Sequence, residues 1–158
     1  MTAAAQPIVP KVVGVSGGGR MGAGITQVFA VAGAMVCLVE RDPATAAAAR
    51  DRVAMSLLRA AEKGLLAESA DAVLERVLLV DEVAALSGDT DLVVEAVPED
   101  AALKVRVLAA AVHVIGRPHR IGGPVGAEED EEVRHLLGGG EPSDGRVVLG
   151  DLRQVLLP

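Results

Sequence analysis

The sequence predicts an α/β fold built on a mostly parallel, doubly wound sheet. Short β-branched apolar runs alternate along the chain with longer stretches of helical character, which is typical of parallel strands covered by helices on both faces. Glycine, proline and aspartate stand at the joins between these stretches, where turns and helix ends need them. A glycine cluster also follows the first apolar run directly, within KVVGVSGGGRMGAGITQVFAVAGAMVCLVERD, residues 11–42.

Each expected element has its own start or stop signal. Four strands are expected from the apolar runs, at residues 11–16, 34–40, 77–80 and 91–96. Four helices are expected between and after them, at residues 20–32, 43–63, 70–75 and 98–114. Gly33 and Gly64 end the first two helices as C-caps. Asp42 is the N-cap of the second helix with Pro43 at its first position, and Ser69 caps the third.

The composition changes after residue 115. Residues 116–146 are rich in glycine, proline and acid, with no clear period beyond a short helix expected at 128–137, and only residues 146–158 recover strand-like content. A length of 158 residues suits one domain. We therefore expect a disordered N-terminus at 1–10, one domain at 11–115, and a divergent tail at 116–158 that is partly ordered at most.

Composition excludes several function classes. The net charge is −7 and Phe29 is the only aromatic residue, so the chain lacks both the positive surface and the stacking platform of a nucleic-acid binder. Five of the negative charges fall in the run 128–132, which we interpret as a solvated segment. Cys37 is alone, which excludes an internal disulfide and a cysteine metal cluster. The longest apolar run, 28–39, holds 12 residues, too few for a membrane helix, and no signal peptide is present, so we expect a cytoplasmic protein.

The glycine cluster spells G-x-G-x-x-G between a strand and a helix. Gly17 permits a tight turn, Gly19 lets the backbone approach a pyrophosphate where a Cβ would collide, and Gly22 lets the helix pack close to the strand. The helix start then offers unpaired N–H groups and the positive end of the helix dipole to the phosphates. In this context the motif predicts a Rossmann-type, dinucleotide-binding sheet. The alternative is a glycine turn without a ligand.

An acid closes the second strand at the spacing that such a site needs. Glu40 lies 23 residues after Gly17 and is expected to accept hydrogen bonds from the adenosine ribose hydroxyls. Its charge would repel a 2′-phosphate, so NAD is favoured over NADP. Arg41 weakens this inference, because an arginine beside the acid can neutralise such a phosphate.

The segments VSGGGRMGAGITQVFAVAG, LVERDP and DLVVEAVPEDAALK resemble the amino-terminal domain of 3-hydroxyacyl-CoA dehydrogenases, including 3-hydroxybutyryl-CoA dehydrogenases. The resemblance covers residues 11 to about 110 and implies two sets of contacts. Contacts to NAD are implied for Gly17, Gly18, Gly19, Arg20, Met21, Gly22, Glu40, Glu99 and Lys104. Contacts to coenzyme A are implied for Ser56 and Lys63. Without the resemblance, the pair Glu99 and Lys104 also fits ordinary charged residues on a helix surface. The same holds for the pair Ser56 and Lys63.

The resemblance stops before the family's catalytic segments. The family continues into an Asn-Thr-Ser segment, whose Ser helps to bind the substrate hydroxyl, and a His-Phe-x-Asn-Pro segment, whose His is the general base, and then into a helical second domain. Asp151 and Leu152 stand about where His-Phe would be, and no catalytic residue is identified. We interpret His113, His119 and His135 as surface histidines. The C-terminal helical domain is expected to be absent.

Three functions stay open on the sequence. The first is the NAD-binding domain of an enzyme that oxidises 3-hydroxyacyl-CoA to 3-ketoacyl-CoA in fatty-acid or butyrate-type metabolism, inactive on its own. The second is a non-catalytic NAD-binding remnant, and the third is a sensing or assembly module. The expected partners are NAD(H) and acyl-CoA, together with a separate helical domain or a second copy of the chain. The tail is either a divergent natural ending or the product of a shifted reading frame.

Overall fold

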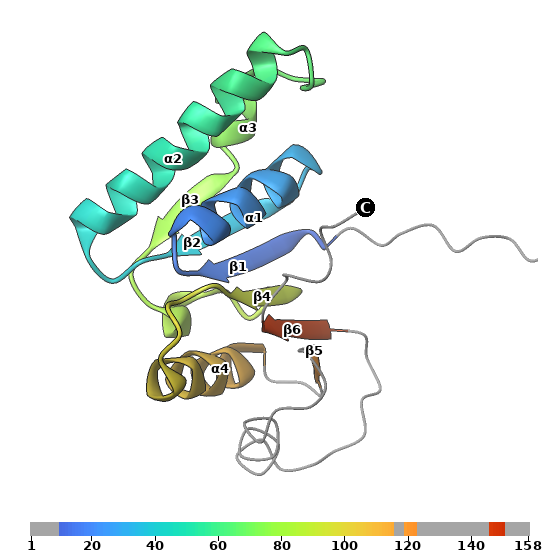
Figure 1. Cartoon of the computed structure of the whole chain (residues 1–158). Coiled ribbons are helices and arrows are strands. Elements are labelled where there is room, and N and C mark those ends of the chain that lie inside the picture. Colours follow the sequence, from blue (N-terminus) through green and yellow to red (C-terminus); the bar gives the residue numbers. More distant parts are fainter. Residues whose placement is uncertain (1–9, 116–118, 123–145, 151–158) are drawn as a thin grey trace, which may run out of the picture.

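The computed structural model describes residues 10–115, 119–122 and 146–150. Six strands form one sheet in the order β3-β2-β1-β4-β6-β5, and all five pairings among them are parallel (Figure 1). The strands are β1 (Val12–Ser16), β2 (Met35–Val39), β3 (Val77–Val80), β4 (Leu92–Glu95), β5 (His119–Gly122) and β6 (Arg146–Gly150). The helices are α1 (Arg20–Val31), α2 (Pro43–Glu62), α3 (Ala70–Leu74), the 3₁₀ helix η1 (Val83–Ala85) and α4 (Ala101–Ile115).

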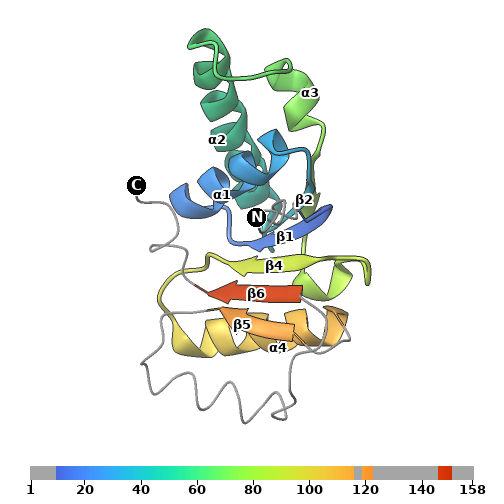
Figure 2. The ribbon, with the colours of Figure 1, turned by 90° about the vertical axis from the view of Figure 1, so that its right-hand side faces the viewer.

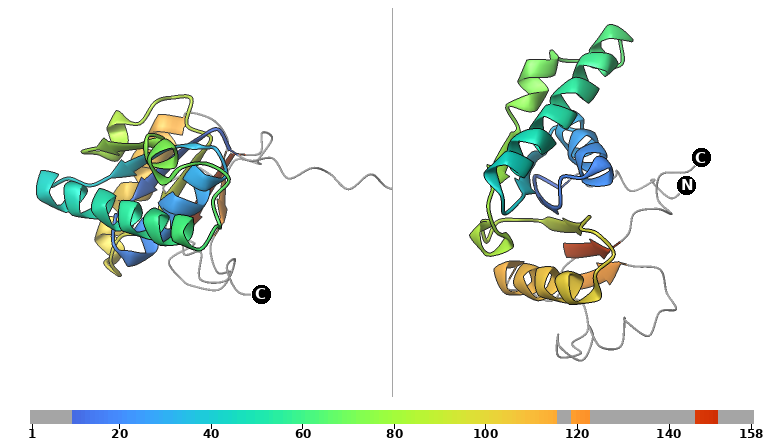
Figure 3. Two further views of the ribbon diagram at one scale, coloured as in Figure 1. Left: turned by 90° about the horizontal axis from the view of Figure 1, so that it is seen from above. Right: turned by 60° about the vertical axis from the view of Figure 1, so that its left-hand side comes forward.

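The helices form two layers, one on each face of the sheet. Helices α1, α2 and α3 lie on one face and α4 lies on the other (Figures 1 and 3). The side chains of β4 show how the sheet serves both layers, since Leu92 and Val94 belong to the core under α1 and α2, while Val93 belongs to the core under α4. The predicted doubly wound α/β fold is confirmed.

The sheet changes its direction of growth next to β1. Strands β2 and β3 are added on one side of β1, whereas β4 pairs with its other edge (Figure 2). The loops that follow β1 and β4 therefore leave the carboxyl ends of neighbouring strands and turn toward opposite faces. In open α/β sheets, such a switch point is where ligands bind.

The predicted caps end and begin the helices on the first face. The Asp42 carboxylate accepts a hydrogen bond from the Thr45 N–H at 2.8 Å, and the Ser69 hydroxyl accepts one from the Ala72 N–H at 3.2 Å. Gly64, just after α2, has φ +67°. The Thr45 N–H also lowers the pKa of the Asp42 carboxyl. The stabilisation by the ionised Asp42 cap is therefore fully present above the unfolded-state pKa of about 3.9. It is lost as the pH falls through the lower folded-state pKa.

The structure differs from the sequence expectation in the start of α4, in the presence of η1 and of β5, and in the strand order. Helix α4 begins at Ala101 instead of residue 98, because the Asp100 carboxylate caps it through the Leu103 N–H at 2.9 Å. The 3₁₀ helix η1 was not predicted. Strand β6 lies between β4 and β5, so the crossover through α4 passes over one strand position. The helix expected at 128–137 lies outside the described residues.

The approach of α1 to β1 is the tightest contact in this part of the fold. A Cβ added to Gly22 would stand 1.7 Å from the carbonyl oxygen of Gly17. Gly17 itself turns with φ +99°, and a Cβ there would lie 2.7 Å from the carbonyl oxygen of Ala96. Both glycines therefore have the backbone tasks that the motif predicts, the tight turn and the close packing of helix on strand.

We expect Gly22→Ala to lower the free energy of unfolding by about 1–3 kcal/mol, the usual cost of overpacking, because the new methyl group would push α1 away from β1. Gly24→Ala is the matched control, since Gly24 is exposed on the same helix and no heavy atom lies within 4 Å of an added Cβ. Because alanine has a higher helix propensity than glycine, Gly24→Ala should stabilise the chain by up to about 1 kcal/mol. Urea unfolding followed by circular dichroism measures both variants, and equal midpoints would contradict the close contact.

Candidate functional site

A cleft of about 1120 Å³ opens where the carboxyl ends of β1, β2 and β4 meet, at the switch point of the sheet. Elements from both helical layers line it, including the start of α1, η1 and the first half of α4. Among the predicted site residues, the cleft brings together Gly17, Gly19, Arg20, Met21, Glu40, Glu99 and Lys104. Gly18 and Gly22 are buried and do not line the cleft, and Ser56 and Lys63 lie outside it.

The start of α1 faces the cleft without a side-chain cap. Gly19 is the N-cap residue, no side chain hydrogen-bonds to this helix end, and the first turn has no acidic residue. Gly19 is exposed, an added Cβ there would meet no atom within 4 Å, and its N–H has no hydrogen-bond partner among the described residues. An uncapped N-terminus carries a partial positive charge and free N–H donors. The loop therefore fits an anionic group such as a diphosphate.

Glu40 closes one wall of the cleft and also shapes the glycine loop. Its Oε1 atom accepts a hydrogen bond from the Gly18 N–H at 2.6 Å. The side chain is half-buried, and Oε2 is left as the acceptor for a ligand hydroxyl. The sequence indicated an acid at this strand end. It did not predict the hydrogen bond between the Glu40 carboxylate and the Gly18 N–H, because the two residues are 22 positions apart in the chain.

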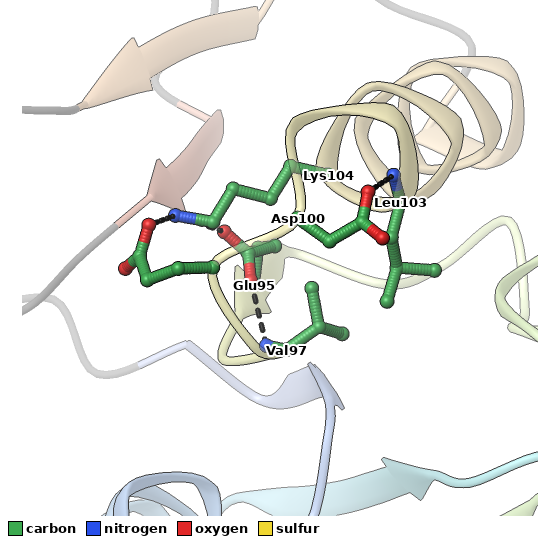
Figure 4. Close-up of polar contacts among 6 residues, drawn as sticks. Glu95, Val97, Asp100, Leu103 and Lys104 are labelled. Atoms are coloured by element: carbon green, nitrogen blue, oxygen red, sulfur yellow. Dashed lines mark hydrogen bonds and ion pairs between the residues drawn. The ribbon is translucent and has the colours of Figure 1, made fainter.

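The opposite wall holds a second acid at a strand end, Glu95, which the sequence analysis did not single out. It is 5% exposed at the end of β4, and its Oε1 accepts a hydrogen bond from the Val97 N–H at 2.6 Å (Figure 4). Its Oε2 lies 3.9 Å from the Lys104 ammonium, which also donates to Glu99 at 2.8 Å. The signal that could have found Glu95 is the one that found Glu40, an acid directly after a buried apolar strand.

A second, smaller groove of about 610 Å³ lies between α1 and α2. Ser56 lines it together with three arginines, Arg20, Arg52 and Arg59, and one acid, Asp51. Lys63 is exposed at the C-cap of α2 and does not line this groove. Of the two residues for which coenzyme A contacts were expected, only Ser56 therefore lines this groove.

The remaining candidate groups are the histidines, the lone cysteine and any cluster that could hold a metal ion. Within residues 10–115, 119–122 and 146–150, no group of three or more His, Cys, Asp or Glu side chains is placed to hold a metal ion. No helix in the same ranges is both long and apolar enough to cross a bilayer. His113 is exposed on α4, as expected, and burial raises the pKa of the half-buried Cys37 thiol, which disfavours a reactive thiolate. His135, Asp151 and Leu152 lie outside the described residues, and His119 is placed by its backbone in β5.

Comparisons with known proteins agree with this geometry. The family model "3-hydroxyacyl-CoA dehydrogenase, NAD binding domain" matches residues 12–121. A 3-hydroxybutyryl-CoA dehydrogenase of Mycobacterium tuberculosis is 38% identical over 110 residues, which cover 69% of this chain and 38% of that protein. The human mitochondrial hydroxyacyl-coenzyme A dehydrogenase is 36% identical over 111 residues, which cover 66% of this chain and 35% of that protein.

A solved structure shows the same likeness. The (S)-3-hydroxybutyryl-CoA dehydrogenase from Ralstonia eutropha has a TM-score of 0.60 and 34% identity to this chain, with 66% of this chain and 37% of that chain covered. The chain thus spans about 35–38% of the length of these relatives.

We expect Gly19→Val to abolish binding of a dinucleotide while the helix content stays close to wild type. Gly19 has φ −59°, which valine can adopt, and space for a side chain is present, so folding should tolerate the change. The valine side chain would, however, occupy the space that a diphosphate needs beside the loop. Circular dichroism and calorimetric titration with NADH should be run on the same sample. Undiminished binding would remove the loop from the site.

Proposed function

The chain belongs to the 3-hydroxyacyl-CoA dehydrogenase family as its NAD-binding domain, and from this we propose that it is the cofactor-binding part of an enzyme that oxidises 3-hydroxyacyl-CoA to 3-ketoacyl-CoA. The single observation that carries the proposal is the joining in one cleft of an uncapped helix N-terminus with the Glu40 carboxylate, which follows a strand. A dinucleotide needs anion binding at its centre and hydrogen-bond acceptors for its ribose hydroxyls, and both lie along this cleft.

Different residues of the cleft would bind different parts of the cofactor. The Gly19 N–H and the first turn of α1 would hold the diphosphate, and Glu40 would accept from the adenosine ribose hydroxyls. Lys104 and Glu99 would contact the other half of the cofactor, past the end of β4. Bound NAD supplies a hydride acceptor for the carbon that carries the substrate hydroxyl. The hydroxyl proton must leave at the same time, and the general base for it is not identified in these 158 residues.

The groove between α1 and α2 supports an acyl-CoA substrate. Coenzyme A carries several phosphate groups, and arginine is well suited to bind phosphate through paired N–H donors. Arg20, Arg52 and Arg59 line the groove together with Ser56, and Asp51 is the one acid beside them. We assign the groove to the phosphorylated end of the coenzyme, with Lys63 as a peripheral cation at the end of the same helix.

A chain that binds NAD without turnover is the second candidate function, either as a remnant or as a sensing or assembly module. It is favoured by one observation, that neither the Asn-Thr-Ser nor the His-Phe-x-Asn-Pro segment of the family is identified in the sequence. Under the first function, a separate helical domain or a second copy of the chain would complete the active site. We propose the cytoplasm as its compartment.

NAD should bind more tightly than NADP, because the Glu40 carboxylate would repel a 2′-phosphate. Glu40→Gln should weaken NAD binding by about 1–3 kcal/mol, the scale of hydrogen bonds to a charged group, and should narrow the preference. Glutamine can still accept from the Gly18 N–H, so the loop contact is kept. Calorimetric titration with both cofactors measures the effect. Tighter NADP binding by the wild type, reversed in Arg41→Ala, would show that Arg41 sets the preference instead.

The 158-residue chain alone should show little or no dehydrogenase activity while it binds NADH. General acid–base catalysis is worth roughly 10²–10⁴-fold, and loss of substrate positioning can cost as much or more. NADH formation from 3-hydroxybutyryl-CoA is the assay, with a full-length enzyme of the family alongside. Turnover within about tenfold of that control would contradict the expectation, and variants of His113, His119 and His135 would then identify the base.

A further inference from the structure

The backbone of Gly18 is held on both sides by charged side chains, one at its N–H and one at its carbonyl. Its N–H donates to the Glu40 carboxylate at 2.6 Å, and its carbonyl accepts from the Arg52 guanidinium at 3.0 Å, across 34 residues. Gly18 is buried, and an added Cβ would lie 2.3 Å from the Cβ of Ala49, so the loop is packed directly against α2. Hydrogen bonds to ionised groups are roughly twice as strong as neutral ones. The loop is therefore anchored on α2 as well as on β2.

This anchoring decides where the next N–H points. The carbonyl of Gly18 and the N–H of Gly19 belong to one planar peptide, and in the trans form they point in opposite directions. Because Arg52 draws the carbonyl toward α2, the Gly19 N–H is directed away from that guanidinium. Gly19 lines the cleft and Gly18 does not, in agreement with this orientation.

The same peptide, between Gly18 and Gly19, is able to flip. It lies between two glycines, which adopt both signs of φ at little cost. If it flipped, the Gly18 carbonyl oxygen would point toward the cleft, where it would repel a phosphate, and the Gly19 donor would be lost. A fixed partner for the carbonyl on α2 prevents this exchange.

We propose that Arg52 is a positioning residue for the dinucleotide, which holds the Gly18 carbonyl on α2 and thereby presents the Gly19 N–H to the diphosphate. The inference rests on the proposed binding of the cofactor at this loop and is independent of the dehydrogenase reaction. Direct attraction between the Arg52 charge and the phosphates is a different mechanism, because Arg52 also lines the cleft wall. The salt concentration distinguishes the two mechanisms. Salt screens a direct attraction between the Arg52 charge and the phosphates, but it does not change the orientation of the peptide.

The test uses the full chain with Arg52→Met, which keeps an unbranched apolar stem and removes the donor, and with Arg52→Lys as the conservative variant. Arg50→Met is the matched control, because Arg50 lies on the same helix and lines neither the cleft nor the second groove. NADH, ADP and adenosine are titrated by NMR at about 50 mM and about 500 mM salt. The amide resonances of Gly18 and Gly19 are followed in the ligand-free protein.

Arg52→Met should weaken NADH and ADP about tenfold at both salt concentrations and adenosine less than about twofold, since only the first two carry a diphosphate. The Gly19 amide resonance should shift before ligand is added, Arg52→Lys should recover part of the loss, and Arg50→Met should match the wild type. An equal loss for adenosine, a loss that disappears at high salt, or unchanged NADH binding would overturn the proposal. Failure of the wild type to bind NADH would instead contradict the proposed function, on which this role depends.

Discussion

The site depends on how closely α1 approaches the loop that precedes it. There is no room for a Cβ between Gly22 and the Gly17 carbonyl, and Gly17 turns against the Ala96 backbone in a conformation that favours glycine. This permits α1 to begin at Arg20, directly after the loop, with its N-terminus at the switch point of the sheet. The free N–H groups and the positive end of the dipole follow from that placement. A larger residue at either glycine would move the helix end, and the anion site with it.

Two carboxylates then give the neighbouring loops their shape. Glu40 follows β2 and Glu95 ends β4, and each accepts a backbone N–H at 2.6 Å, from Gly18 and Val97 respectively. A carboxylate removed from water needs such donors. With one oxygen of each tied to the backbone, the other oxygen serves a further partner, which for Glu95 is the Lys104 ammonium. The chain as a whole carries −7, so an anionic ligand is accommodated by local N–H groups and cations and not by net charge.

The elements with strong local signals were predicted best. Strand β3 was expected at its observed bounds, and the caps at Asp42 and Ser69 make the hydrogen bonds that their residue types suggested. Helix α4 was placed three residues too early, because Pro98 and Asp100 are both acceptable near a helix start and only the Asp100 contact to Leu103 distinguishes them. The order of β6 and β5 had no signal at all, since strand order is set by how crossovers pack and not by the strands themselves.

The sequence by itself determined the fold class, the tasks of Gly17 and Gly22, and the strand end that carries Glu40, because backbone conformation and strand periodicity act over a few residues. The tertiary structure decided how these parts face one another. It assigned one oxygen of Glu40 to the Gly18 N–H, brought Arg52 to the Gly18 carbonyl, and buried Glu95 beside Lys104. The contacts to Gly18 cross 22 and 34 residues. Only the packing of α2 on the loop and of α4 on β4 selects the side-chain directions that such contacts require.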